Sequence, residues 1–201
     1  PPAVATDGTS YVGTGDGSVE AINALGVLSW RYMVEGPVAW SPVLDASGRL
    51  YVATATDLYS VGKSGVLGWH VRTPSLIATD LNVQNPWGVL FGGADDGVWA
   101  YSPHAVALWH VNVGAPISAG PAARGNRVVV ATASGEAWLL DGAMKRAVVR
   151  FGARIQSVVG IFPDGSAALI AGHVLYRVGA HGGIRWRHEG IDWATPVKDG
   201  A

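Results

Sequence analysis

The side chains that carry out catalysis or bind metals are sparse in this sequence. The six histidines stand at positions 70, 104, 110, 173, 181 and 188. They show no metal spacing such as H-x-x-x-H, and Asp16, Asp95 and Asp96 lie in turn-like stretches where Asp suits the backbone. No cysteine is present, which excludes disulfides, thiolate metal sites and thiol nucleophiles, and no G-x-S-x-G sequence leads into a helix. We therefore expect a chain that is not an enzyme and that carries no metal or cofactor.

Three tryptophans stand in loop-like stretches and are candidates for binding a partner. Trp40 in "VAWSPV" and Trp193 in "DWATPV" each lie just before a Pro that opens a strand, and Trp87 lies in "QNPWG". Exposed aromatic side chains often anchor a protein or a sugar. The alternative is that each ring packs against its own structural unit. The sequence leaves both interpretations open.

A cluster of basic residues is the second candidate for a binding surface. The stretch "MKRAVVRFGAR" contains Arg146, Arg150 and Arg154. Residues 1–100 carry four Lys or Arg against nine Asp or Glu, whereas residues 101–201 carry ten against six. Such a cluster is either a solvated edge or a docking patch for an acidic partner or an anionic surface, such as a membrane. The net charge of −1 and the lack of interleaved aromatic residues argue against nucleic acid as a partner.

These candidates must be positioned by a unit that recurs along the whole chain. The phrase "EAINALGVLSW" (20–30) returns as "YSVGKSGVLGW" (59–69) and as "WAYSPHAVALW" (99–109). The residues that close its five copies are Trp30, Trp69, Trp109, Val148 and Trp186. A period of about forty residues belongs to propeller blades or to helical arrays. We predict units at about 1–40, 41–80, 81–119, 120–159 and 160–194, with a sixth beginning at 195–201.

The local pattern within each unit favours strands. Runs of four to eight residues rich in Val, Tyr, Trp and Leu are bounded by Gly, Asp, Asn or Pro, and "GDGS", "ADDG" and "TASG" recur in one slot as hairpin turns. Amphipathic stretches of ten or more residues without Gly or Pro are missing. We predict an all-β propeller of four-stranded antiparallel blades, with about five blades visible. The recurring tryptophan then packs against the next blade and needs no ligand.

Residues 7–54, "DGTSYVGTGDGSVEAINALGVLSWRYMVEGPVAWSPVLDASGRLYVAT", resemble the PQQ-like β-propeller repeat. The resemblance extends over essentially the whole chain, although the fifth unit is shortened. It implies the propeller fold and, because most members are extracytoplasmic, a periplasmic or extracellular location. Quinoprotein dehydrogenases, the outer-membrane assembly lipoprotein BamB and sensor domains of bacterial kinases share the repeat, so the resemblance implies no single function.

The dehydrogenases provide the enzymatic alternative. Their resemblance would imply an eight-bladed ring with a quinone and Ca²⁺ near the axis, an Asp as base and, in many members, a disulfide of adjacent cysteines. This chain has no cysteine, five units and no obvious set of oxygen ligands for Ca²⁺. We therefore predict a non-enzymatic scaffold for protein interaction or assembly, without a transmembrane segment. A ligand-sensing or carbohydrate-binding propeller and a fragment of a quinoprotein dehydrogenase remain the alternatives.

The two ends of the sequence resemble each other. "TPVKDGA" (195–201) matches "SPVLDASG" (41–48) and "PPAVATDG" (1–8), and no signal peptide is visible at the start. If five blades closed into a ring, both ends would compete for one innermost strand. We expect the native chain to continue to six, seven or eight blades, or open arcs to associate. An open arc would expose two apolar blade faces, so we expect a neighbour there, either more of the same chain or another subunit.

Overall fold

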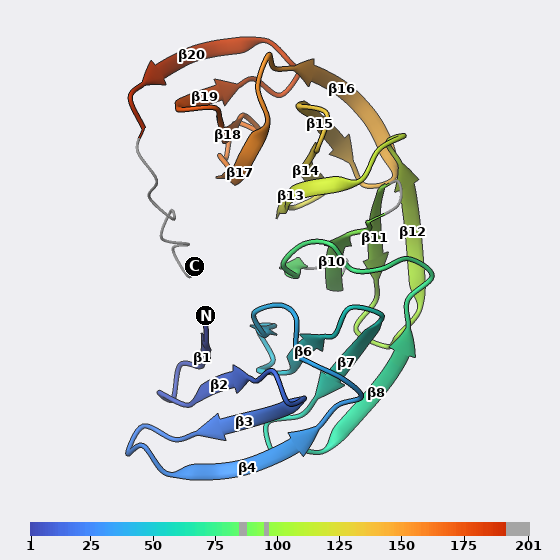
Figure 1. Cartoon of the computed structure of the whole chain (residues 1–201), viewed down its shortest axis with the longest axis vertical. Helices are drawn as coiled ribbons and strands as arrows, with labels where there is room; N and C mark the ends of the chain where they lie inside the picture. Colours follow the sequence, from blue (N-terminus) through green and yellow to red (C-terminus); the bar gives the residue numbers. More distant parts are fainter. Residues whose placement is uncertain (85–87, 95–96, 192–201) are drawn as a thin grey trace.

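The structure is a computed structural model that describes residues 1–84, 88–94 and 97–191, and these residues form five four-stranded antiparallel sheets. The sheets are the blades of an arc, and in each blade the strands follow the chain from the inside of the arc to its rim (Figure 1). Blade 1 contains β1 (Ala3–Val4), β2 (Ser10–Gly13), β3 (Ser18–Ile22) and β4 (Leu28–Met33); blade 2 contains β5 (Val43–Leu44), β6 (Leu50–Ala53), β7 (Asp57–Val61) and β8 (Leu67–Arg72). Blade 3 contains β9 (Asn82–Gln84), β10 (Gly88–Gly92), β11 (Gly97–Tyr101) and β12 (Ala107–Asn112). Blade 4 contains β13 (Ile117–Arg124), β14 (Arg127–Thr132), β15 (Glu136–Asp141) and β16 (Met144–Arg150); blade 5 contains β17 (Ile155–Ile161), β18 (Ala167–Ala171), β19 (Val174–Val178) and β20 (Ile184–Glu189).

The five blades follow one another along the described chain, and two of the predicted unit boundaries fall within strands. The predicted sixth unit at 195–201 lies outside the described residues. The boundary between 119 and 120 lies inside β13, and the boundary between 159 and 160 lies inside β17. The innermost strands of blades 4 and 5 have eight and seven residues, whereas β1 and β5 have two each. Pro121 therefore lies within its strand and does not mark the start of a blade.

The hydrophobic core lies in the seams between neighbouring blades. Successive side chains of a strand point to opposite faces of its sheet. In β6, Leu50 and Val52 pack toward blade 1, whereas Tyr51 and Ala53 pack toward blade 3, and all four are fully buried. The described residues form four core clusters, one in each of the four seams. The alternation of apolar residues thus gives every inner blade two buried faces.

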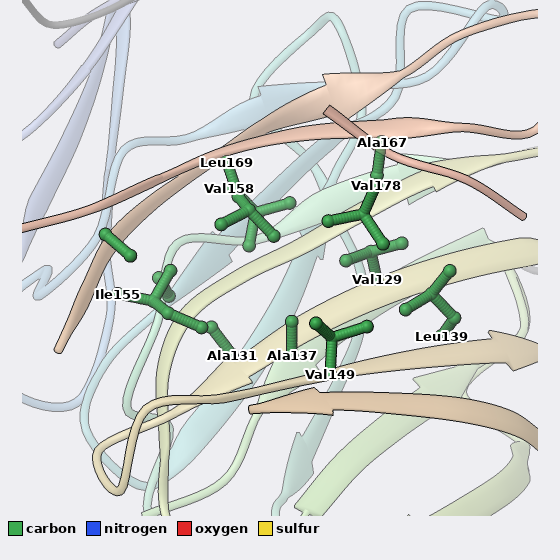
Figure 2. Packing of buried hydrophobic residues seen from close by; sticks show 12 residues of the cluster. Val129, Ala131, Ala137, Leu139, Val149, Ile155, Val158, Ala167, Leu169 and Val178 are labelled. Carbon is green, nitrogen blue, oxygen red and sulfur yellow. The ribbon is translucent and has the colours of Figure 1, made fainter. Parts of the chain in front are cut away.

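The seam between blades 4 and 5 shows this packing at close range (Figure 2). Side chains of the two sheets point toward one another across it, with Val129 and Leu139 from blade 4 and Val158, Leu169 and Val178 from blade 5. Leu169 and Val178 are fully buried. Each buried aliphatic side chain contributes about 1.5–3 kcal/mol relative to an exposed one, so the seams hold the arc together.

The recurring tryptophan packs on the next blade, as the sequence predicts. The indole Nε1–H of Trp30 in blade 1 donates to the carbonyl oxygen of Lys63 in blade 2 over 2.7 Å. The indole Nε1–H of Trp69 in blade 2 donates to the carbonyl oxygen of Pro103 in blade 3 over 2.8 Å. Both acceptors lie in the turn between the third and fourth strands of the receiving blade. One indole and one turn therefore form the repeated contact at the outer part of these two seams.

The fourth copy differs from the prediction by one residue. Trp30 pairs across its hairpin with Ala21, which faces the next blade. In blade 4 the residue that corresponds to Ala21 is Leu139, and its partner is Ala147. The turn between β15 and β16 is shorter by one residue. Val148, which lies ten residues after Trp138, therefore pairs with Trp138 and points to the opposite face of the sheet from Ala147. Ala147 occupies the tryptophan position of blade 4, and the assignment of Val148 is wrong.

Candidate functional site

A groove of about 570 Å³ lies on the inside of the arc and is the candidate functional site. It is lined by the innermost strands of blades 3, 4 and 5 and by the loops that precede blades 2 and 3. β13 and β17 lie side by side and form most of its wall. The lining residues are Trp40, Ala78, Thr79, Asp80, Asn82, Ser118–Ala123 and Gln156–Gly160.

Irregular backbone shapes this wall. The pairing of β13 with β14 shifts twice, between Ile117 and Ala119 and between Ala119 and Ala122, and the second shift contains the cis peptide Gly120–Pro121. The pairing of β17 with β18 also shifts twice. Bulges and proline are the usual means of preventing a free strand edge from pairing with another strand. The groove therefore suits recognition through side chains and selected backbone groups rather than simple addition of a strand.

Of the three candidate loop tryptophans, Trp40 is the one that lies within the described residues, and it lines this groove. It follows blade 1 in the chain and is partly buried against the core cluster between blades 2 and 3. Within the described part of the chain, its indole N–H has no hydrogen-bond partner. The ring thus packs on the blades and also borders the groove, and its role in binding a partner stays a prediction. Trp87 and Trp193 lie outside the described residues.

Side-chain amides supply polar groups beside Trp40. The Nε2 of Gln156 donates to the carbonyl oxygen of Gly172 over 2.7 Å. The Oε1 of Gln156 and the Oδ1 of Asn82 have no partner among the residues described. Such groups are satisfied by solvent or by a ligand, since an unsatisfied buried polar atom costs about 1–3 kcal/mol. The lining combines one indole, two amides and the exposed carboxylate of Asp80, which is suited to a polar ligand with hydrogen-bonding groups.

The predicted basic cluster does not form a continuous positive patch. Arg146 pairs with Asp141 at 3.0 Å, and Arg150 pairs with Glu136 at 2.8 Å. Both arginines lie on β16, the outermost strand of blade 4, with Arg150 as its last residue, and Arg154 follows in the loop before blade 5. Acidic partners on the neighbouring strand offset much of the charge. None of the three arginines lines the groove.

A second, smaller cavity of about 430 Å³ lies where blades 4 and 5 meet. Arg146 borders it together with Asp141, Arg127 and His181. Gly165 leaves room for the Arg127 guanidinium at this cavity, because a Cβ at this position would lie 1.5 Å from Nη1 of Arg127. Arg146 therefore belongs to a mixed-charge recess and not to the groove.

Two of the histidines, His70 and His110, pack on aromatic residues of their own blades. His70 stacks on Tyr59, with ring centroids 4.3 Å apart, and its Nε2 lies 2.8 Å from Oδ1 of Asp57. His110 stacks on Trp99 at 4.0 Å. Burial raises the pKa of Asp57, but hydrogen bonds from Thr56 and His70 outweigh this effect and lower the pKa overall. Within residues 1–84, 88–94 and 97–191, no three His, Asp or Glu side chains come together as a metal site would require.

The sequence contains a signal for these stacked pairs, but for the groove it points only to Trp40. Tyr59 and His70 are eleven residues apart, as are Trp99 and His110, and this spacing places them opposite each other on the third and fourth strands. Asn82 and Gln156 are far apart in the chain and do not recur in each unit. Only the curvature of the arc brings them to one groove.

Comparison with known proteins supports the architecture. Neither a protein-family model nor a curated protein matches the chain. Among solved structures, BamB from Moraxella catarrhalis is similar, with a TM-score of 0.79 and 15% sequence identity over 96% of this chain. The fold is that of a PQQ-like β-propeller. The chain spans 65% of the length of that BamB structure. In the part of the chain that the structure describes, no helix is long and apolar enough to cross a membrane.

Proposed function

We propose that this propeller is a non-enzymatic scaffold that acts outside the cytoplasm and binds a polypeptide segment in its axial groove. The observation that carries the proposal is the groove itself, in which Trp40 lies beside the partnerless amide oxygens of Asn82 and Gln156. An indole gives apolar contact area, and amides recognise the backbone N–H groups of an extended segment.

The dimensions of the groove favour a peptide. β13 and β17, which form the wall, have eight and seven residues. At a rise of about 3.3 Å per residue, a wall of this length accommodates an extended segment of roughly six to eight residues. The bulges in both strands determine which backbone groups remain accessible to a bound segment. We therefore expect recognition to depend on which residue of the segment lies opposite each of these groups. The polar groups of the groove are amides, the carboxylate of Asp80 and the hydroxyls of Thr79, Ser118 and Ser157, and among the described residues no histidine or lysine lines the groove to activate a hydroxyl as a nucleophile.

The proposed location rests on the fold. The PQQ-like repeat is mostly found in exported proteins, and the similar solved structure is a BamB. A protein partner or a neighbouring subunit near a membrane surface is consistent with this setting.

A library of random twelve-residue peptides, displayed on phage and selected on the purified chain, tests the function. We expect enriched peptides whose binding is lost in Trp40→Ala and weakened at least tenfold in Gln156→Ala. Leu108→Ala is the matched control, because Leu108 is an exposed apolar residue on the rim of blade 3. Enrichment that survives both groove substitutions would refute the site.

The two alternative functions give different results. Binding on a glycan array that depends on Trp40 would instead identify a carbohydrate-binding propeller. Dye reduction after incubation with PQQ and Ca²⁺ would identify a quinoprotein enzyme. We expect neither signal above that of the heat-denatured chain.

A further inference from the structure

The seam between blades 4 and 5 has no tryptophan at the position where the other seams have one. In the other three seams, Trp30, Trp69 and Trp109 pack against the core cluster that two neighbouring blades share. Blade 4 has Ala147 at this position. A Cβ on Gly182 of blade 5 would lie 3.0 Å from Cβ of Ala147, so the methyl group reaches the turn of the next blade but provides no ring. The space that an indole fills elsewhere is therefore not filled by Ala147.

The recess of about 430 Å³ between blades 4 and 5 borders this position. Leu139, the strand partner of Ala147, lines the recess, and so does Ala180 in the third-to-fourth-strand turn of blade 5. Ala180 has the place that Pro103 has in blade 3, where the carbonyl oxygen of Pro103 accepts a hydrogen bond from Trp69. No described residue donates a hydrogen bond to the carbonyl oxygen of Ala180. The acceptor of the indole contact is thus present in a seam that has no indole.

An arginine of blade 4 also lacks the contact that its counterpart makes. In blade 2, Nη1 of Arg49 donates to the same carbonyl oxygen of Pro103 over 2.6 Å. Arg127 has the corresponding place in blade 4, because Leu50 and Val128, the residues that follow the two arginines, have the same position in the second strand. Arg127 lines the recess and makes no ion pair or hydrogen bond with any described residue. Its guanidinium is therefore available to a ligand.

The charges around the recess favour an anion. Asp141 pairs with Arg146 at 3.0 Å and lies opposite Arg127 across β14 and β15. His181, in the same turn of blade 5 as Ala180, also lines the recess. Two arginines therefore share one carboxylate, and the net charge of the lining is positive. A guanidinium binds carboxylate and phosphate groups through two parallel hydrogen bonds.

We propose that this recess binds a small aromatic acid, which is a planar ring system that carries a carboxylate or a phosphate group. The ring occupies the space that an indole occupies in the other seams and packs beside Ala147 and Leu139. The acid group binds the guanidinium of Arg127. A ring N–H donates to the carbonyl oxygen of Ala180, as Trp69 donates to Pro103. The recess shares no residue with the groove, so this inference is independent of the proposed function.

The size and the lining of the recess suit a ligand of this kind. Sites for small molecules have volumes of about 300–1,000 Å³ and combine apolar walls with a few polar groups. Val129 and Leu139 lie on the face of blade 4 that points into this seam and provide the apolar part (Figure 2). A ring that lies over the guanidinium of Arg127 also gains a cation–π contact. A ring without an acid group leaves Arg127 unpaired, and an acid group without a ring leaves the recess unfilled.

Isothermal titration calorimetry with two aromatic acids tests the site. Indole-3-acetate carries a ring N–H and a carboxylate, whereas 1-naphthyl phosphate carries a ring and a phosphate. We expect at least one of them to bind with a Kd below about 1 mM, and the tighter of the two identifies the acid group. Indole, acetate and inorganic phosphate should each bind at least about tenfold more weakly, because each of them uses only one half of the recess.

A pair of arginine variants assigns the binding to Arg127. Arg127→Gln should weaken binding of the aromatic acid about tenfold or more, because it removes the guanidinium and keeps a polar side chain. Arg150→Gln is the matched control, since Arg150 is an exposed arginine of the same blade that does not border the recess. The control should leave the Kd unchanged, and both variants should unfold at a urea midpoint close to that of the native chain. Equal Kd values for the two variants would overturn the proposal.

The repeat itself supplies a variant that closes the recess. Ala147→Trp combined with Leu139→Ala copies the pair of Trp30 and Ala21 in blade 1. We expect this variant to lose the binding of the aromatic acid, because its own indole occupies the site. Binding that persists in the folded double variant would contradict the proposal. Simple anions that bind as tightly as the aromatic acids, or aromatic acids that show no binding at 1 mM, would also contradict it.

Discussion

The contact between an indole and a turn can be measured with two glycines that differ in one respect. Gly26 and Gly65 occupy the same position in the turns of blades 1 and 2, with φ of 78° and 81°. Only Gly65 has an indole against it, that of Trp30. We predict that Gly65→Ala destabilises the chain more than Gly26→Ala, and that the difference reports the contact.

The magnitude follows from two costs. A residue with a side chain in the left-handed region costs about 1–2 kcal/mol, and both variants bear this cost equally. Gly65→Ala also pushes a methyl group to 2.8 Å from the ring of Trp30, and overpacking of this kind costs about 1–3 kcal/mol. Blade 3 has Ala105 at the same turn position with φ of 66°, so a turn of this type accommodates a methyl group by a shift. We therefore expect a difference in the lower range, about 1–2 kcal/mol.

Urea unfolding at pH 7 followed by circular dichroism provides the assay, with midpoints compared at a common slope. The Trp30→Ala background is the control, because removing the indole should abolish the difference between the two glycines. Equal destabilisation by Gly26→Ala and Gly65→Ala in the native background would refute the reasoning. It would mean that the ring of Trp30 moves away from the turn at no measurable cost.

Three other predictions test the seams and the titrating groups. Leu169→Ala should cost about 2–5 kcal/mol in urea unfolding because Leu169 is fully buried, whereas the exposed Leu108→Ala should cost less than about 0.5 kcal/mol. Asp57→Asn should destabilise the chain at pH 7, and its effect should shrink as the pH falls below about 4, because the lowered pKa of Asp57 stabilises the folded state only while the carboxyl is ionised. Burial, aided by Asp45, raises the pKa of Tyr51 to about 12. Folding stability should therefore fall from pH 10 to 12, because the unfolded state loses this proton first. Tyr51→Phe should reduce that fall in urea titrations.

The sequence predicts the fold well because the blade is repeated. Five copies of one apolar phrase place Trp30 and Trp69 at equal positions, and a residue that packs on the next blade must recur with the period of the blades. The error at Val148 has a local cause. A turn that is shorter by one residue shifts the register of β16, and a shift by one residue moves a side chain to the other face of the sheet.

The candidate site was predicted only in part, since its residues do not share the period. Trp40 was a candidate because the blade repeat does not account for an aromatic residue at that place, whereas Asn82 and Gln156 are ordinary polar residues of inner strands. The basic cluster was overestimated for a related reason. Glu136 and Arg150 are fourteen residues apart, and their ion pair depends on the strand pairing of blade 4 rather than on the local sequence.

The separation between seams and groove explains how one fold can serve different partners. The seams are built from residues such as Leu169 that face a neighbouring blade, and each seam depends only on the two blades that form it. The groove is lined in part by polar side chains such as Asn82 and Gln156, which belong to no seam cluster, whereas Val158 lines the groove and also packs in a seam. We therefore expect substitutions of Asn82 or Gln156 to affect the proposed ligand more than the stability of the chain. The bulges of β13 and β17 keep the free strand edges from pairing nonspecifically. In the proposed function, the side chains beside these bulges determine which ligand binds.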